Sequence, residues 1–303
     1  MLRTELHCHN VYSNGHVGDL EPPFDSNVTI NEQLEKSFES KLDILFVTNH
    51  NTLDGFKQIT EYKNNHEKFS NLEIYPAVEI TTDKEAHVLV YGLHDEIKSN
   101  QSIDEILDAA KSQDAVTIAP HPFSLVDSIR DDSLKCDLFE VFNSSNVDIY
   151  SNKKAEIFAK ENNLLTTVGS DSHISSTIGR CTNMIDAQNN LDDVISTMKK
   201  GKISIEKTEY ITRSEVLEHI RYKIENSKEY IDQYVKEFYP KYFCLFNMMY
   251  KSYMFTKKSL VWDIVFRIAL FGLRRISYKI NFEGYDPYVF RTRDIPTITK
   301  MIF

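Results

Sequence analysis

The stretch Thr4-Glu5-Leu6-His7-Cys8-His9, close to the start of the sequence, decides how the remaining residues are interpreted. A β-strand places alternate side chains on one face, so we expect His7 and His9 to point the same way and Cys8 the other way. Two imidazoles side by side at the end of a strand can bind one metal ion. The alternative is a strand with two unrelated histidines, because a motif as short as His-x-His also occurs by chance.

The first two thirds of the sequence, residues 1–205, alternate short β-rich runs with amphipathic stretches of helical length. Such alternation predicts parallel strands joined by crossover helices. Polar residues recur where the predicted strands end, which favours a (β/α) barrel over a doubly wound sheet, since no Gly-rich loop is present. The expected strands are 3–8, 43–48, 73–81, 86–92, 115–119, 138–142, 164–169 and 182–185, with helices near 29–41, 53–66, 102–113, 147–162 and 190–200.

Residues 206–303 have a different texture and form a second region, a helical extension. We expect one polar helix over 212–238, ended by Pro240. Residues 241–280 are apolar around most of the helical circumference, which favours a buried helical subdomain packed on the barrel. A peripheral membrane-surface element is the second interpretation, because Lys and Arg accompany Phe and Trp there, and a basic surface for a phosphate-rich substrate is the third. The longest uncharged run, Tyr242–Tyr250, is too short for a transmembrane helix.

Composition and charge narrow the class of protein. The 303 residues are 41% hydrophobic and 26% charged, as in an ordinary globular protein. The net charge of −10 argues against non-specific nucleic-acid binding by the whole chain, although residues 236–279 carry nine Lys and Arg against two acids, a local charge of +7. Four scattered cysteines and the absence of a signal segment before His7 predict a reducing, cytoplasmic location.

Imidazoles and carboxylates at the predicted strand ends form a candidate set of metal ligands. Such nitrogen and oxygen ligands suit two or three ions of Zn, Mn or Fe. Clustered ions activate water and hold the oxygens of an in-line phosphoryl displacement. No Gly-x-Ser-x-Gly or Walker motif offers another mechanism, and His66, His94 and His219 are expected to be surface residues. The candidate ligands are His7, His9, His50, Glu79, His87, His121, Asp171 and His173.

The order of the motifs His-x-His, Thr-x-His-x-Thr, apolar-Glu, His-Val-x-x-Tyr-Gly, His-Pro and Gly-Ser-Asp-x-His resembles the PHP superfamily, named for polymerase and histidinol phosphatase. The resemblance covers about residues 1–205. It implies a distorted TIM-like barrel of seven parallel strands, with a metal cluster at the carboxyl end and metal-dependent phosphoester hydrolysis. It also implies that His7, His9, Glu79 and Asp171 hold one ion, with Glu79 bridging, that His87 and His121 hold a second, and that His50 and His173 hold a third.

The chain departs from the family pattern near the third ion. It has Ser13-Asn14-Gly15 where the family usually has Ser-Asp-Gly, and Thr48-Asn49-His50-Asn51 in place of Thr-Asp-His-Asp. An amide oxygen is a weaker ligand than a carboxylate, so we expect a weakened third site. Asn14 itself or His16 is the candidate to complete it. Residues 15–28 form a loop longer than a barrel needs, which either covers the mouth of the barrel or is a plain surface loop.

Two arginines near the motifs are candidates for binding phosphate. Arg130 follows the His-Pro motif and Arg180 follows the Gly-Ser-Asp-x-His motif, and arginine suits bidentate phosphate binding. Each can equally form a salt bridge at a helix end. Together with Asp171 and His173, they form the expected catalytic set, in which His173 or a metal-bound water protonates the leaving group.

Three functions therefore remain open from the sequence. The first is a metal-dependent phosphoesterase that hydrolyses a small phosphorylated metabolite or nucleotide through a metal-bridging hydroxide. The second is a nuclease acting on nucleic-acid ends, because bases stack on aromatic residues beside basic grooves. The third is a catalytically weakened metal-binding scaffold whose C-terminal region binds a membrane or a partner. A metal-dependent amidohydrolase fits less well, because of Glu79 and the Gly-Ser-Asp-Ser-His ending.

Overall fold

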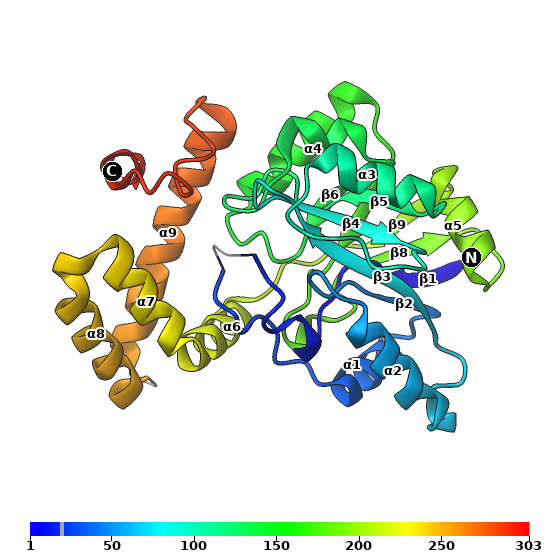
Figure 1. Cartoon of the computed structure of the whole chain (residues 1–303), viewed down its shortest axis with the longest axis horizontal. Coiled ribbons are helices and arrows are strands. Elements are labelled where there is room, and N and C mark those ends of the chain that lie inside the picture. The colour runs from blue at the N-terminus through cyan, green and yellow to red at the C-terminus, as the bar shows by residue number, and fades with distance from the viewer. Residues whose placement is uncertain (19–20, 258, 303) are drawn as a thin grey trace.

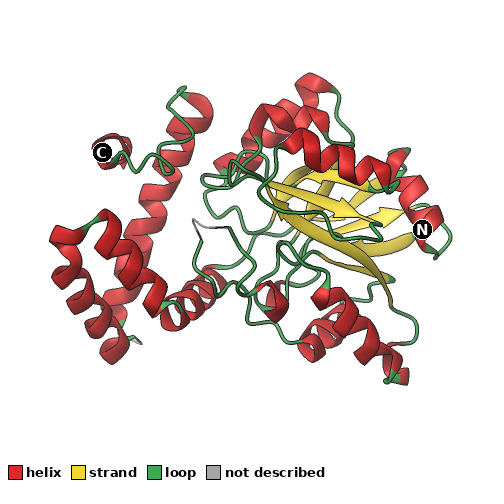
Figure 2. Ribbon diagram, viewed as in Figure 1, coloured by secondary structure: helices red, strands yellow, loops and turns green. Residues whose placement is uncertain are grey.

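The computed structural model of the chain describes residues 1–18, 21–257 and 259–302. One curved sheet surrounded by helices makes up the larger part of the molecule, and a group of helices from the C-terminal region stands beside it (Figure 1). Figure 2 shows that the strands lie together in the larger part, and that the smaller part consists of helices and loops.

Within the described residues, the sheet contains nine strands in the order β7-β6-β5-β4-β3-β2-β1-β8-β9. The first eight overlap the strands that the sequence predicts, whereas β9 was not expected. β9 contains residue 205, where the sequence places the boundary between the two regions. The division into 1–205 and 206–303 stays a prediction. The strands are β1 (Leu2–Glu5), β2 (Ile44–Val47), β3 (Glu73–Thr81), β4 (His87–Tyr91), β5 (Val116–Ala119), β6 (Leu138–Asn143), β7 (Thr166–Gly169), β8 (Thr182–Ile185) and β9 (Ile203–Lys207).

The strands do not all run in one direction. β4 is antiparallel to β3 and β5, and β8 is antiparallel to β1 and β9, whereas the remaining neighbours pair in parallel. The expectation of parallel strands is therefore wrong for β4 and β8. For β4 the reason is the short connection: residues 82–86 alone separate it from β3, and a parallel crossover needs a dozen residues or more.

The sheet curls into a nearly closed barrel, because its edge strands β7 and β9 approach each other. Asn183 in β8 bridges the seam: its amide donates to the Val168 carbonyl of β7 at 2.7 Å, and its side-chain oxygen accepts from the Val168 N–H at 3.0 Å. Beyond the ends of β1 and β7, Cys8 and Ser172 form an isolated parallel bridge. The result is the distorted α/β barrel that the sequence predicts.

Helices surround the barrel, and an apolar interior fixes its strands (Figure 1). Capping boxes begin α1 and α3, as expected for Thr29 with Glu32 and for Ser102 with Glu105. In the interior, the buried Tyr91 hydroxyl donates to the carbonyl of Leu6 at 2.6 Å, which holds the strand end that leads into the His-x-His motif. The helices of this part are α1 (Ile30–Glu39), α2 (Asp54–Asn64), α3 (Ile103–Ser112), α4 (Tyr150–Asn162) and α5 (Leu191–Lys199).

The C-terminal region is helical, as predicted, but its first helix is interrupted. Ser227, with φ −100° and ψ 29°, leaves the helical conformation and separates α6 from α7, so a single helix over 212–238 is wrong. Among the described residues, every helix is either too short or too polar to cross a membrane. The helices of this region are α6 (Arg213–Asn226), α7 (Lys228–Phe238), α8 (Phe243–Thr256), α9 (Leu260–Phe282) and α10 (Ile295–Ile302).

Only the last part of α9 packs as a buried helix against the barrel side of the molecule. Ile276 and Ile280 are buried beside α10, and the Ser277 hydroxyl donates to Asp148 at 2.6 Å. The rest of α9 and most of α8 leave large apolar side chains exposed. The favoured expectation, a buried helical subdomain over 241–280, is therefore correct only near the end of that range.

Candidate metal centre

The carboxyl end of the barrel gathers the predicted ligands into one buried cluster. Residues that follow β1, β2, β5 and β7 reach this end directly. His87 begins its strand, but β4 runs in the opposite direction and pairs its His87 with Thr81 at the end of β3, so His87 reaches the same edge. The structure brings together His7, His9, His50, Glu79, His87, His121, Asp171 and His173, each with a ring nitrogen or a carboxylate oxygen within 3.6 Å of another member.

The first group has the geometry of a four-ligand site. Nε2 of His7 lies 3.3 Å from Oε2 of Glu79 and 3.4 Å from Oδ1 of Asp171. Nε2 of His9 lies 3.2 and 3.3 Å from the same two oxygens. Ligand atoms around a tetrahedral ion with bonds of about 2.1 Å are about 3.4 Å apart. Each of the two imidazoles therefore lies from both carboxylates at the spacing that two ligands of one ion have.

The second group shares Glu79 with the first. While Oε2 of Glu79 faces the first group, Oε1 lies 3.1 Å from Nδ1 of His87 and 3.1 Å from Nε2 of His121. Asp127, which the sequence analysis missed, lies 3.4 Å from Nδ1 of His121 and joins both histidines in a possible ligand set. The arrangement suits a carboxylate that bridges two ions.

The third group contains a carboxylate that no motif indicated. Asp25 is fully buried, and its Oδ2 lies 3.1 Å from Nε2 of His173 and 3.7 Å from Nε2 of His50. With His9 these residues place four ligand atoms within 4.8 Å of one another. Asp25 belongs to the long loop over residues 15–28, so that loop does lie at the mouth of the barrel.

Several candidate ligand atoms lie close to other ligand atoms but make no hydrogen bond with them. Among the described residues, Nε2 of His9, Oδ2 of Asp25, Nδ1 of His50 and Nδ1 of His87 are buried and lack a hydrogen bond of acceptable geometry. A buried polar atom without a partner is costly, and these atoms converge on one another rather than on donors. The donor set and its unmet bonding capacity fit divalent metal ions.

The electrostatics of the cluster also favour bound cations. Burial would raise the pKa of the Glu79 carboxyl, but the surrounding His7, His87 and His50 hold that pKa well below its usual range. Burial lowers the pKa of His50 to about 3, so this imidazole is neutral, as a metal ligand must be. The cluster therefore combines ionised carboxylates with at least one neutral imidazole, a combination that suits divalent cations.

Neighbouring side chains fix the orientation of the ligands. Nδ1 of His7 donates to Glu140 at 3.0 Å, and the same carboxylate accepts the backbone N–H of His121 at 2.7 Å. Nδ1 of His9 lies 3.1 Å from the hydroxyl of Ser13. Such bonds leave the other ring nitrogen free for a metal. The sequence analysis missed Glu140, although it is a carboxylate in an apolar strand, the same signal that revealed Glu79.

The asparagines that replace the usual acids have structural roles. The side-chain oxygen of Asn14 accepts the backbone N–H groups of Asp25 and Ser26, at 2.6 and 3.0 Å, and its amide donates to the Ser26 carbonyl at 3.0 Å. Asn14 thus holds the loop that presents Asp25 and does not itself face the cluster. His16 is exposed, and its backbone makes the contacts described for it: its carbonyl oxygen accepts from the Asn51 amide, and its N–H donates to the Ser13 carbonyl. The structure therefore does not bring Asn14 and His16 together with the ligands.

The two arginines are engaged away from the ligand atoms. Arg180 pairs with Glu215 at the start of α6, with a nitrogen–oxygen distance of 2.6 Å, and more distantly with Glu209 at 3.5 Å. Arg130 donates to Asn281 of α9 at 3.3 Å, and burial lowers its pKa to about 10. Both therefore join the C-terminal region to the barrel, as helix-end contacts do.

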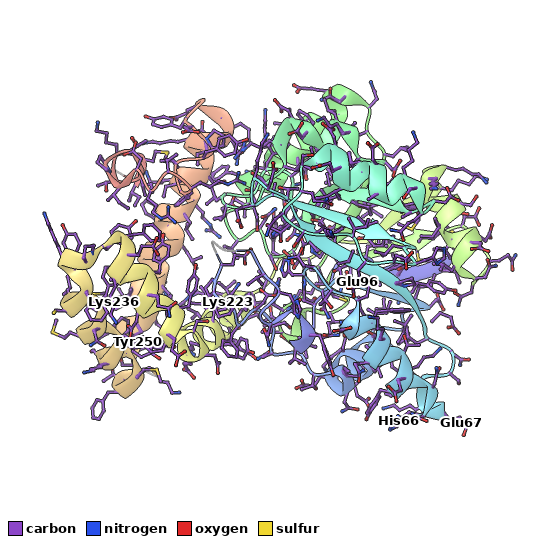
Figure 3. The ribbon with its side chains drawn as sticks, viewed as in Figure 1. His66, Glu67, Glu96, Lys223, Lys236 and Tyr250 are labelled. Carbon is purple, nitrogen blue, oxygen red and sulfur yellow. The ribbon has the colours of Figure 1, made fainter. Side chains whose placement is uncertain are left out.

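Helix α6 covers part of the cluster. The ring of His219 stacks on His173 with centroids 4.7 Å apart, and its Nε2 donates to the carbonyl of Asp25 at 2.8 Å. One turn later, Nζ of Lys223 lies 3.2 Å from Oδ1 of Asp25 and 3.5 Å from Oε2 of Glu21 (Figure 3). The expectation that His219 is a surface residue is wrong, because helix packing rather than local sequence determines its surroundings.

Comparison with known proteins gives matches in sequence and in fold. Residues 150–203 match the family PHP_C, described as PHP-associated. The uncharacterized protein MJ1587 of Methanocaldococcus jannaschii is 30% identical over 153 residues, which cover 48% of this chain and 85% of that protein. PsfC from Pseudomonas syringae PB-5123 matches with a TM-score of 0.51 at 19% identity, over 74% of this chain and 99% of that chain. The lesion-specific endonuclease PfuEndoQ from Pyrococcus furiosus matches with a TM-score of 0.49 at 16% identity, over 67% and 57% of the two chains.

Proposed function

This chain belongs to the PHP superfamily of metal-dependent hydrolases, and we propose that it is a phosphoesterase acting on a small phosphorylated metabolite or nucleotide. The observation that carries the proposal is the convergence of His7, His9, Glu79 and Asp171, in which each imidazole Nε2 lies 3.2–3.4 Å from an oxygen of each carboxylate. Two further groups adjoin it through Glu79 and His9. Adjacent metal groups that share ligands suit phosphoryl transfer, which needs charge compensation on several oxygens at once.

The proposed ligand assignments follow the three groups. His7, His9, Glu79 and Asp171 hold the first ion, and His87 and His121 hold the second with the other oxygen of Glu79. His50, His173 and Asp25 hold the third, with Asp25 in the role that the sequence analysis gave to Asn14 or His16. When bound, these ions supply an activated water and electrostatic stabilisation of the phosphoryl oxygens.

His173 serves the proposed site as a ligand rather than as the proton donor. Its Nδ1 donates to the backbone carbonyl of Asp171 at 2.9 Å, and this bond points Nε2 toward Asp25. The ring of His219 stacks on the ring of His173 and restricts its rotation. A ring held in this way keeps one ligand atom in a fixed position.

Lys223 is the proposed contact for the substrate phosphate, in place of Arg130 and Arg180. Its ammonium group pairs with Asp25 of the third ligand group and with Glu21, whereas the guanidinium of Arg180 pairs with Glu215, away from the ligand atoms. A phosphate ester brings negative charge to the mouth of the barrel, and a lysine at the rim binds it as a point charge. Because Lys223 comes from α6, the C-terminal region takes part in recognising the substrate.

Hydrolysis assays with defined metal content test the proposed function. Protein loaded with Mn or Zn is expected to release phosphate from an aryl phosphate, and from one or more members of a panel of nucleotides and sugar phosphates. The Asp171→Asn variant, checked for unchanged circular dichroism and melting temperature, is expected to lose most of this activity. Full metal occupancy by elemental analysis without phosphate release from any substrate would contradict the proposal and favour a metal-binding scaffold.

A further inference from the structure

Helices α8 and α9 follow one another in the chain as a hairpin, residues 243–282, and the end of α8 and the start of α9 lie at the end of the helical group, apart from the barrel (Figure 1). Its surface is unusually apolar. Phe255 beside the turn is 92% exposed and Leu260 is 79% exposed. The exposed apolar side chains of the hairpin include Leu245, Phe246, Met248, Met249, Met254, Phe255, Leu260, Val261, Ile264, Val265, Ile268 and Phe271.

Part of this apolar surface is confined to one face of a helix. On α9, Val261, Ile264, Val265 and Ile268 recur at helical spacing and so share one face. Monomeric proteins in water rarely expose contiguous apolar patches of more than a few hundred Å². Another surface must therefore cover the hairpin when the protein works.

The charge of the hairpin indicates the chemistry of that surface. Residues 243–282 carry seven Lys and Arg against one acid, a net charge of +6, and the remaining residues have a net charge of −16. The acid, Asp263, is already paired with Arg213 and Arg221 at 3.6 and 3.4 Å. Exposed Lys251 and Arg267 lie among the apolar residues. Apolar side chains interspersed with cations match the anionic headgroups and acyl chains of a phospholipid bilayer.

We propose that the hairpin of α8 and α9 docks on the surface of an anionic phospholipid bilayer. Phe255 and Leu260 enter the boundary between headgroups and acyl chains, and the basic side chains lie among the headgroups. The hairpin lies in the interface and does not span the bilayer, in keeping with the absence of a membrane-crossing helix among the described residues.

Charge argues against the main alternative, a second copy of the same chain. A twofold dimer through this face would bring together two hairpins that each carry +6, with like charges facing one another. An anionic bilayer compensates the same charges. An anionic bilayer repels the acidic remainder of the chain and attracts the hairpin, so the hairpin is oriented toward the bilayer. The proposal is independent of the proposed hydrolase activity.

Trp262 provides a direct probe, because it is the single tryptophan of the chain and lies near the turn of the hairpin. It is half-buried, and its Nε1 donates to Thr256 at 2.9 Å. The full chain is titrated with vesicles of phosphatidylcholine alone and of phosphatidylcholine mixed with phosphatidylglycerol. We expect a blue shift of Trp262 emission and co-sedimentation with the anionic vesicles, both weakened by added salt.

Matched variants distinguish binding through the hairpin from non-specific binding through any exposed apolar side chain. The double variant Phe255→Ser/Leu260→Ser is expected to bind anionic vesicles about ten-fold more weakly or worse. The control is Leu134→Ser/Ile157→Ser, which removes two exposed apolar side chains of the barrel part, 49% and 42% exposed, and should bind like the wild type. Circular dichroism and the elution volume of both variants report whether they fold.

Three results would overturn the proposal. The first is equal binding of the two double variants to anionic vesicles. The second is the absence of a preference for anionic over zwitterionic vesicles. The third is light scattering that shows a dimer without vesicles, converted to a monomer by Phe255→Ser/Leu260→Ser, together with no vesicle binding by the wild type. That last outcome would assign the hairpin to self-association.

Discussion

Asp25 uses its two carboxylate oxygens for different partners. Oδ2 faces His173 and His50, and Oδ1 pairs with Lys223. We predict that Asp25→Asn lowers the metal content by one ion per chain. Among the described residues, Asp25 is the only carboxylate of the third group, and an amide oxygen is a weaker ligand. Elemental analysis of protein after gel filtration measures this directly.

Asn14→Asp is the informative counterpart to this variant. It restores the residue that the family usually has, yet the structure predicts no gain in metal. The amide of Asn14 donates to the carbonyl of Ser26 at 3.0 Å and to the Tyr222 hydroxyl at 3.1 Å, and a carboxylate would face the carbonyl without a proton to share. We expect a small loss of stability, about 1 kcal/mol, measured by urea unfolding. An Asn14→Asp variant that binds an additional ion would show that Asn14 belongs to the site.

Glu140 acts on the metal through His7. Its carboxylate accepts from Nδ1 of His7 and so leaves Nε2 for the ion. We predict that Glu140→Gln weakens metal binding by about 10- to 100-fold, the usual cost of removing a carboxylate behind a ligating histidine. Competition with a chromophoric chelator measures the change. Glu96→Gln is the control, because Glu96, labelled in Figure 3, is an exposed carboxylate that pairs with Lys57. The metal affinity of this variant should match that of the wild type.

The residues that sequence could predict share a local signal. His7 and His9 alternate along one strand end, and Glu79 interrupts an apolar run, so each can be recognised from its immediate neighbours. Asp25 has no such signal, because a long loop brings it to the cluster and Asn14 holds that loop by hydrogen bonds. The hydrogen bonds of Glu140 likewise depend on how neighbouring strands are placed.

At the scale of elements, α6 places Lys223 beside Asp25 at the mouth of the barrel, where Lys223 is the proposed contact for the substrate phosphate. We predict that Lys223→Met raises KM for the phosphorylated substrate about ten-fold or more, with a smaller effect on kcat, because a charge that binds the ground-state phosphate is lost. Lys223→Arg should recover part of this loss. Steady-state kinetics separate the two parameters.

Lys228→Met is the matched control on the next helix. Lys228 pairs with Asp232 within α7, so its removal should leave KM and kcat unchanged. If Lys223→Met changed the melting temperature but not KM, Lys223 would have a structural role through Asp25 and not a role in binding substrate.

The errors at this scale have physical causes. Periodicity identified the strands, but the direction of β4 depends on the length of its connection. Apolar content over 241–280 predicted burial, yet hydrophobicity specifies only that a surface is covered and not what covers it. Ser227 ends α6 without a proline or glycine, which are the usual signals for a helix boundary.

For the whole molecule, the C-terminal helices are part of the same structure as the barrel. α6 reaches the ligands through Asp25, and α9 is held by Asp148 and by the carbonyl of Phe123, two residues after His121. The carboxyl end of the barrel therefore faces the C-terminal helices rather than open solvent alone. A change in the helices can thus reach the site through a few identified contacts.

Metal removal tests how far the buried cluster determines the stability of the whole molecule. Without ions, the carboxylates of Glu79, Asp171 and Asp25 remain buried beside one another and depend on protonated imidazoles for compensation. Bound ions stabilise the folded state by mass action, by about 2.7 kcal/mol for a site at 100 times its Kd. We therefore predict that chelation lowers the melting temperature by at least about 5 °C, and that added Zn or Mn restores it. Calorimetry measures the shift on samples whose metal content is known, and an unchanged melting temperature after verified removal would show that the cluster is folded and satisfied without ions.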